Sequence, residues 1–306
     1  MKTRKVYPGE VHHVCQQTVG GVLVFYTIND YLVFFTIFCT VARRYGIKVL
    51  SLCPMVDHIH NVVVVDRDLQ LASFVQLYTR LFAREWNESR GRKGSLFKHR
   101  YMSSVKLGNK QVKTTVNYSY NNPVERKLVE RAEDYRWNFL RYARNAHPYS
   151  VPVNEENKSN LFRGILREMR TTYEGGGHLC YQQLERWGRR MDQNAMQQIA
   201  DYAISLWNVI DYGEVISYYG DYDAMLHSMH DNTGSDYEIR EDRNLYSDAV
   251  YADCSRILLK EGWVKDLFQL PLLPIEKKKQ MAHLLLSRTT ARPRQIEKYL
   301  HLPPGR

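Results

Sequence analysis

The chain has 306 residues, a formal net charge of +10 at pH 7 and 44% hydrophobic residues, which is ordinary for a globular protein long enough to form two domains. An apolar run from Tyr31 to Val41 is too short to cross a bilayer, and no apolar signal segment follows the basic start, so we expect a cytoplasmic protein without membrane spans. The five cysteines are scattered and form no CxxC pattern, which argues against a disulfide framework or a zinc knuckle.

The positive charge is concentrated in the first half of the chain. Residues 1–150 contain 23 Lys and Arg against 11 Asp and Glu, a net charge of +12, whereas the remainder has a net charge of −2. Charge that served only solubility would be spread more evenly. A basic half beside a nearly neutral half indicates an anionic partner, most simply a nucleic acid.

Strands and helices alternate in the predicted structure of this first half. The predicted elements are a strand at about 12–26, a helix at 30–45, strands at 47–53 and 58–65, a helix at about 69–86, a strand at 96–106 and a short helix at 111–122. We expect Asn29 or Asp30 to cap the first helix and Gly46 to end it. The order predicts an α+β fold, a ferredoxin-like antiparallel sheet with helices packed on one face. The other face would then be free for a ligand.

The character of the chain changes after residue 148. Pro148 and Pro152, followed by a polar run, resemble a linker, and the rest is predicted to be mainly α-helical. We therefore expect one domain at residues 1–148 and a helical accessory domain at residues 149–306. A packing or oligomerisation module is the simplest role for this second domain.

The strand at 58–65 carries a His-x-His pattern. Side chains two residues apart on a strand point to the same face, so His58 and His60 lie side by side while Ile59 turns to the opposite face. Two imidazoles on one strand make half of a metal site. Taken alone, the pattern is also compatible with two polar residues on a solvated strand face.

Basic residues crowd the region between the second and third predicted helices. They are Arg80, Arg84, Arg90, Arg92, Lys93, Lys98, Arg100, Lys106, Lys110 and Lys113, and the interleaved aromatic residues are Trp86, Phe97 and Tyr101. Basic groups neutralise phosphates, and aromatic rings stack on unpaired bases, so the cluster predicts a surface for single-stranded nucleic acid. A solvated face with core aromatics remains the alternative for individual members, Phe97 above all.

Tyr118 and Asn122 lie four residues apart and share one face of the short predicted helix. If that face meets the histidine strand, Tyr118 presents a phenol beside the metal, and the Asn122 carbonyl oxygen becomes a third ligand suited to Mg²⁺ or Mn²⁺. Two other interpretations stay open. Tyr118 is one of 22 tyrosines and could fill a gap, and Asn122, before Pro123, could cap a following helix.

These residue types together predict a phosphoryl-transfer reaction. A protonated tyrosine oxygen is a weak nucleophile, and a divalent metal would polarise the scissile phosphate and position it for in-line attack. The products would be a phosphotyrosine bond and a free 3′-hydroxyl. Because the bond energy is retained, rejoining would need no nucleotide cofactor.

Three blocks of the sequence, in the same order, resemble motifs of the HUH-type single-tyrosine transposases, in particular the REP-associated tyrosine transposase branch. The blocks are Met55-Val56-Asp57-His58-Ile59-His60, then Gly91-x-x-Gly94-x-Leu96-Phe97-x-x-Arg100-Tyr101, then Tyr118-x-x-x-Asn122-Pro123-Val124 with the downstream run Glu133-Asp134-Tyr135-x-Trp137. Each block alone is weak, but the combination is specific. The resemblance covers about residues 8–145.

The resemblance implies an HUH nuclease fold, cleavage and joining of single-stranded DNA, and recognition of hairpins in repeated palindromic elements. It implies metal ligation by His58 and His60, a nucleophilic Tyr118 and Asn122 as third ligand. It also implies a bacterial, nucleoid-associated protein that acts as a monomer or a homodimer. Two positions depart from the family pattern: Val56 replaces a usual proline, and Tyr120 stands where histidine is frequent, so we assign Tyr120 no role.

The C-terminal region resembles relatives less closely. Residues 281–302 resemble the first part of a helix-turn-helix, but Pro303 and Pro304 stand where the recognition helix should begin, so we expect the motif to be incomplete.

Other functions fit the sequence less well. A protein that keeps the fold but only binds and regulates hairpin DNA is the main alternative, and joint retention of His58, His60 and Tyr118 disfavours it. Rolling-circle initiators and relaxases usually carry these motifs in another order or with a helicase domain. A histidine-triad hydrolase should have a third histidine at position 62, which is Val62.

Overall fold

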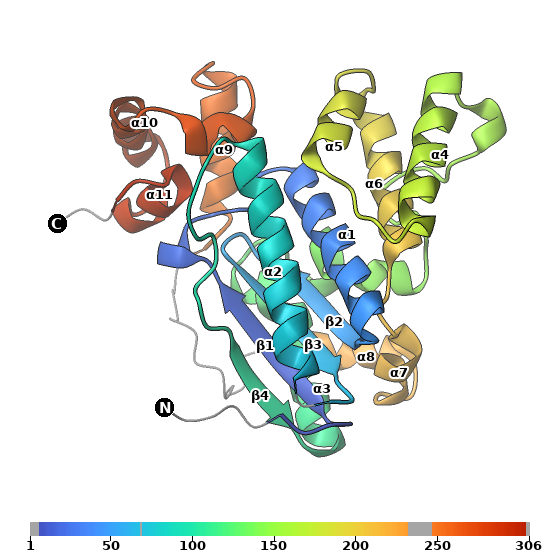
Figure 1. The fold of residues 1–306 in the computed structure, drawn as a ribbon. Coiled ribbons are helices and arrows are strands. Elements are labelled where there is room, and N and C mark those ends of the chain that lie inside the picture. The colour runs from blue at the N-terminus through green and yellow to red at the C-terminus, as the bar shows by residue number, and fades with distance from the viewer. Residues whose placement is uncertain (1–5, 68, 232–246, 304–306) are drawn as a thin grey trace.

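The computed structural model describes residues 6–67, 69–231 and 247–303. Four strands form one antiparallel sheet: β1 (Val11–Gln17), β2 (Lys48–Pro54), β3 (His58–Val64) and β4 (Met102–Lys106). Their order across the sheet is β2-β3-β1-β4, which places the N-terminal strand inside the sheet (Figure 1). The predicted α+β class with a ferredoxin-like sheet is confirmed.

Two strands are shorter than predicted. β1 ends at Gln17 because the chain then turns through η1 (Val19–Gly21), where Gly20 and Gly21 have φ angles of 70° and 68°. Positive φ angles favour glycine, which has no Cβ to clash with the backbone. The predicted strand at 96–106 forms only from Met102, and its first part joins the sheet through an isolated bridge between Phe97 and Thr18.

Helices α1 (Ile28–Tyr45) and α2 (Gln70–Ser89) cover one face of the sheet (Figure 1). Helix α1 begins one residue after Thr27, which caps it in a reciprocal capping box with Asp30, so the prediction of Asn29 or Asp30 as the cap is wrong by two or three residues. Gly46 ends the helix with a φ of 62°, as predicted.

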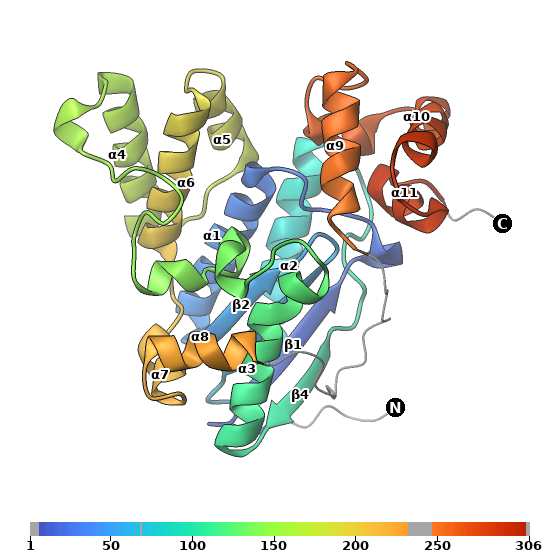
Figure 2. The same ribbon diagram turned by 180° about the vertical axis from the view of Figure 1, so that it is seen from behind.

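Helix α3 (Gly108–Glu125) packs on the opposite face, so the expectation that this face is free for a ligand is wrong (Figure 2). The helix also continues through Pro123 for two residues, since the fixed φ of proline is a helical value and only the hydrogen bond of its own nitrogen is lost. Asn122 therefore lies inside α3 and does not cap a new helix. The chain continues through short turns, η2 (Ala132–Asp134), η3 (Arg136–Asn138) and η4 (Leu140–Ala143).

The rest of the described chain is mainly helical, as predicted. Its elements are η5 (Glu155–Asn157), α4 (Asn160–Glu174), α5 (Tyr181–Gly188), α6 (Gln193–Trp207), α7 (Tyr212–Ser217), α8 (Tyr222–His230), α9 (Val250–Lys260), η6 (Leu267–Leu272), α10 (Ile275–Arg288) and α11 (Pro293–Leu300). Helices α5 and α6 pack beside α1, and α8 packs on α3 (Figures 1 and 2). Among the described residues, no helix has both the length and the apolarity needed to span a membrane.

The hydrophobic core continues across the predicted boundary at residue 148. Phe34 and Phe38 of α1 belong to the same buried cluster as Ile204 and Trp207 of α6. A second cluster joins Leu23 to α9, α10 and α11. The division into residues 1–148 and 149–306 stays a prediction, but the two parts share their apolar interior, and burial of this kind is the main stabilising term in folding.

Candidate active site

His58 and His60 stand at the beginning of β3, on the face of the sheet that α3 covers. Their rings meet edge to face with centroids 4.9 Å apart. Ile59, between them, is buried in the core against the other face, as the alternation of a strand predicts. The two histidines therefore share one face of the sheet, as predicted. That face is covered by α3 and is not exposed to solvent.

Asp57 orients His58. An Asp57 carboxylate oxygen, Oδ1, lies 2.6 Å from Nδ1 of His58, and the Nζ atom of Lys298 lies 3.6 Å from Oδ2. Burial alone would raise the pKa of the Asp57 carboxyl, but the hydrogen bond to His58 and the charges of His58, Lys298 and Arg126 hold that pKa below its ordinary value. A charged Asp57 accepts a hydrogen bond from Nδ1–H of His58, so Nε2 is the His58 nitrogen that could bind a metal.

His60 lies between two side chains from different elements. Its Nδ1 atom is 3.0 Å from Nε2 of His13 on β1, and its Nε2 atom is 3.3 Å from Nδ2 of Asn122 on α3. His13 has no role predicted from the sequence. The available signal was the adjacent pair His12 and His13 on the first strand, which must point to opposite faces.

Tyr118 and Asn122 project from α3 toward β3. The Tyr118 ring meets His60 edge to face at a centroid distance of 5.3 Å and His13 at 5.7 Å. The structure thus brings the two predicted histidines, the tyrosine and the asparagine together, although β3 and α3 are far apart in the chain. Relative exposures are only 3% for His58, 0% for His60, 4% for Tyr118 and 1% for Asn122.

The donor set fits a divalent metal. The Oδ1 atom of Asn122 is buried and has no hydrogen-bond partner among the described residues. Buried polar atoms usually have a partner, and a bound cation would supply one here. The amide oxygen is a donor suited to Mg²⁺ or Mn²⁺, and imidazole nitrogens are the commonest metal ligands in proteins. Within the described ranges there is no group of three or more His, Cys, Asp or Glu that could hold a metal, and this donor set contains only two such residues.

Arg90 does not belong to a DNA-binding surface. Its guanidinium group is fully buried, donates a 2.7 Å hydrogen bond to Oδ1 of Asp30 and lies over the rings of Trp86 and Phe268. The prediction of Arg90 as a DNA contact is therefore wrong, because a cation enclosed by a carboxylate and aromatic rings cannot reach a phosphate. Lys106 and Tyr101 are buried as well and do not offer their side chains to solvent.

The other predicted DNA contacts fall on two sides of the sheet. Exposed side chains are Arg80, Arg84, Lys93, Lys98, Arg100 and Lys110, and Arg92 is half-buried. Arg80 and Arg84 belong to α2, whereas Lys110 belongs to α3 on the opposite face. Lys93, Lys98 and Arg100 lie in the loop that leads to the edge strand β4, so these three and Lys110 form the part of the cluster nearest that edge.

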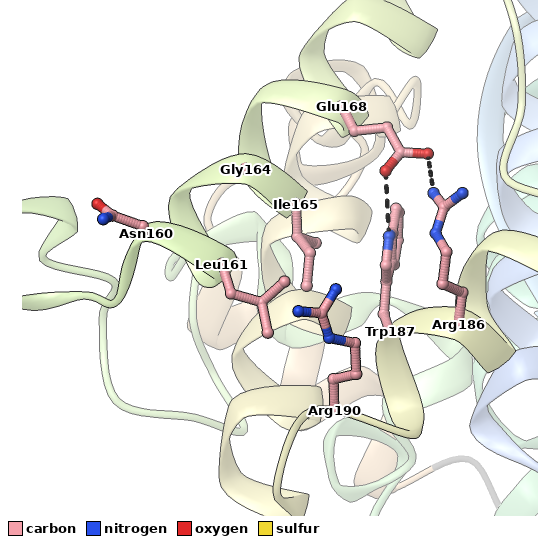
Figure 3. A pocket seen from close by; sticks show the side chains of 8 residues that line it. All are labelled: Asn160, Leu161, Gly164, Ile165, Glu168, Arg186, Trp187 and Arg190. Atoms are coloured by element: carbon pink, nitrogen blue, oxygen red, sulfur yellow. Dashed lines mark hydrogen bonds and ion pairs between the residues drawn. The ribbon is translucent and has the colours of Figure 1, made fainter.

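A pocket of about 330 Å³ lies elsewhere, between α4 and α5 (Figure 3). Its lining is Asn160, Leu161, Gly164, Ile165, Glu168, Arg186, Trp187 and Arg190. Glu168 accepts hydrogen bonds from Trp187 and Arg186, so its charge is already neutralised (Figure 3). None of these residues is a predicted site residue.

Comparison with known proteins finds a family that the first half of the chain is similar to. Residues 24–122 match the family model of IS200-like transposases. The matched segment contains His58, His60, Tyr118 and Asn122, and the resemblance inferred from the motifs is confirmed for it. A solved structure of a REP-associated tyrosine transposase bound to a REP hairpin aligns at 18% identity and a TM-score of 0.41, over 51% of this chain and 94% of that one. No curated protein has significant similarity to the chain.

Proposed function

We propose that the protein is an HUH-type single-tyrosine transposase, a DNA endonuclease and strand transferase that acts on single-stranded DNA containing hairpins. The observation that carries the proposal is the contact of Tyr118 with His60, with Asn122 on the same helix face, inside the segment that matches IS200-like transposases. The proposed substrate is a repeated palindromic element, and the motif resemblance is the support for that choice.

In the proposed reaction, His58, His60 and Asn122 would hold one Mg²⁺ or Mn²⁺ ion. The ion would neutralise charge on the scissile phosphate and orient it. Tyr118 supplies the attacking oxygen. A bond forms between this oxygen and phosphorus, the bond from phosphorus to the 3′ oxygen breaks, and the phenol proton is transferred to the released 3′ oxygen, which becomes the 3′-hydroxyl. Attack by a 3′-hydroxyl on the phosphotyrosine bond reverses these steps and joins strands.

The exposed cations Lys93, Lys98, Arg100 and Lys110 are the proposed phosphate contacts of this domain, with Arg80, Arg84 and Arg92 as further candidates. Replacing a phosphate-binding cation lowers affinity for all sequences and reduces the dependence of binding on salt. We assign the chemistry to residues 1–148 and a supporting role to residues 149–306, in a monomer or homodimer of the bacterial cytoplasm associated with the nucleoid.

One observation favours a second function. Because Tyr118 and its neighbours are almost fully buried, the segments that cover them must open before DNA reaches the tyrosine oxygen. A hairpin-binding regulator that retains the fold without the chemistry would need no such opening.

Covalent trapping separates the two functions. Wild-type protein is incubated with labelled single-stranded DNA from its own flanking locus, hairpins included, and Mn²⁺, and is then run on a denaturing gel. We expect an adduct in wild type, no adduct in Tyr118→Phe and an undiminished adduct in Tyr120→Phe, the matched control. A shifted hairpin on a native gel without any adduct would support the regulator instead, and an adduct that persists in Tyr118→Phe would exclude Tyr118 as nucleophile.

A further inference from the structure

We infer that His13 is a positioning residue that fixes the tautomer and ring plane of His60. The inference rests on the proposed function, because it concerns a residue that would bind the metal. It goes beyond the family match, since His13 lies outside residues 24–122.

The geometry of β1 and β3 places the two rings together. The strands pair with Val62 opposite His13 and His60 opposite Cys15, and opposite residues of an antiparallel pair share a face, so His13 and His60 are diagonal neighbours on the α3 side. The two rings are stacked at 25° with centroids 5.1 Å apart, and both histidines are buried. Burial removes competition from water, which strengthens the 3.0 Å hydrogen bond between the ring nitrogens.

The chemistry of imidazole then assigns the proton. A neutral imidazole carries one N–H, and the other nitrogen offers a lone pair. Nε2 of His60 faces Asn122, the proposed third ligand, so this nitrogen must offer the lone pair for both residues to bind one ion. Nδ1 of His60 must then carry the proton and donate a hydrogen bond to Nε2 of His13. Histidine ligands usually make such a hydrogen bond through the nitrogen that does not bind metal.

His13 also contacts the proposed nucleophile, because its ring meets Tyr118 edge to face. One side chain therefore touches both the metal-binding histidine and the tyrosine. His12, the preceding residue on β1, serves as a comparison for His13 because it points to the other face of the sheet. Its ring nitrogens form hydrogen bonds with the backbone N–H of Tyr7 and the backbone carbonyl of Glu10.

Binding of Mn²⁺ alone to the full chain, measured by titration calorimetry, tests the role without any activity readout. His13→Phe keeps an aromatic ring but removes the acceptor, and we expect it to weaken Mn²⁺ binding about 10- to 100-fold. His13→Gln restores an acceptor oxygen and should recover most of the affinity. His12→Phe is the matched control and should bind within about twofold of wild type, since it lies on the other face.

Nitrogen-15 NMR of the metal-free wild type supplies a second measurement that needs no variant to fold. We expect the chemical shifts of His60 to show the proton on Nδ1. A proton on Nε2, or wild-type Mn²⁺ affinity in a folded His13→Phe, would overturn the inference. Failure of wild type to bind Mn²⁺ would instead overturn the metal-dependent function proposed above, so the two failures are distinguishable.

Discussion

The ammonium group of Lys298 lies 3.6 Å from the carboxylate of Asp57, the residue that orients His58. This contact joins α11 to the residue directly before β3, the strand that carries two of the proposed metal ligands. It is one of several links, because the main chain of α11 also accepts hydrogen bonds from Leu23 and from the Tyr26 hydroxyl. Helix α11 is therefore attached both to Asp57 and to the segment that contains Leu23 and Tyr26.

Gly21 makes room for Lys298, and its substitution tests the contact. A Cβ at Gly21 would lie 2.9 Å from Cε of Lys298, whereas a Cβ at Gly20 would meet nothing within 4 Å. Both glycines have positive φ angles, so either alanine variant should lose about 1–2 kcal/mol of unfolding free energy to backbone strain. Gly21→Ala should lose about 0.5–1 kcal/mol more, because Lys298 moves away from Asp57.

Urea unfolding of both variants measures the difference, and Lys298→Ala provides the reference background. In that background, the extra loss of Gly21→Ala over Gly20→Ala should vanish, since the clash and the ion pair are both gone. Equal losses for the two variants in the wild-type background would show that the approach of Lys298 has no energetic consequence.

Local patterns explain which parts of the site could be predicted from the sequence. The His-x-His alternation on β3 and the spacing of Tyr118 and Asn122 on α3 are set by the periods of strand and helix, so these four residues were named without a structure. That α3 would meet β3 was only an expectation. The sequence did not predict that α3 would cover the face of the sheet that carries His58 and His60, because this depends on how α3 packs.

Residues that act through distant neighbours could not be predicted in the same way. His13 is 47 positions from His60, and their meeting depends on the register of β1 against β3. Arg90 resembled its basic neighbours in the sequence, but its partner Asp30 is 60 positions upstream. Charge counting cannot separate an exposed arginine from a buried one whose carboxylate comes from another helix.

The two halves of the proposed active site should act in cis. Helix α3, which carries Tyr118, is fastened on its outer side by α8, because Asn117 hydrogen-bonds Ser228 and Asn121 hydrogen-bonds the Met229 carbonyl. A mixture of Tyr118→Phe with the double variant His58→Ala, His60→Ala should therefore form almost no DNA adduct. The control mixture of wild type with Tyr118→Phe should give adduct in proportion to wild type. Substantial adduct from the two inactive variants would show that α3 is exchanged between subunits.

Arg90 should govern stability and not DNA affinity. The side chains of Arg90 and Asp30 are both fully buried, and Asp30 also accepts a 2.7 Å hydrogen bond from the Tyr181 hydroxyl. Arg90→Met would leave a buried carboxylate without its cation, so we expect a loss of about 3–5 kcal/mol in unfolding free energy. Arg84→Met, an exposed substitution on α2, the helix that ends just before Arg90, should change stability by less than about 0.5 kcal/mol.

Chemical denaturation and a hairpin-binding titration measure the two properties separately. Folded Arg90→Met protein should bind hairpin DNA as wild type does. A variant with normal stability and weakened binding would reinstate Arg90 as a DNA contact.

His301 should make the attachment of α11 sensitive to acid. Its Nε2 donates a 2.7 Å hydrogen bond to the Leu23 carbonyl, its ring stacks on Trp86, and burial lowers its pKa to about 4 from an ordinary value of 6.5. Above pH 6.5 the imidazole is neutral in both the folded and the unfolded chain, so its protonation does not lower the free energy of unfolding. As the pH falls from 6.5 to 4, the unfolded chain binds the proton first, so stability declines by at most about 3 kcal/mol, and below pH 4 the loss is complete.

His301→Gln keeps a donor for Leu23 but cannot titrate, so its unfolding free energy should fall less than that of wild type between pH 7 and pH 4.5. Parallel losses in the two proteins would show that other groups cause the acid sensitivity.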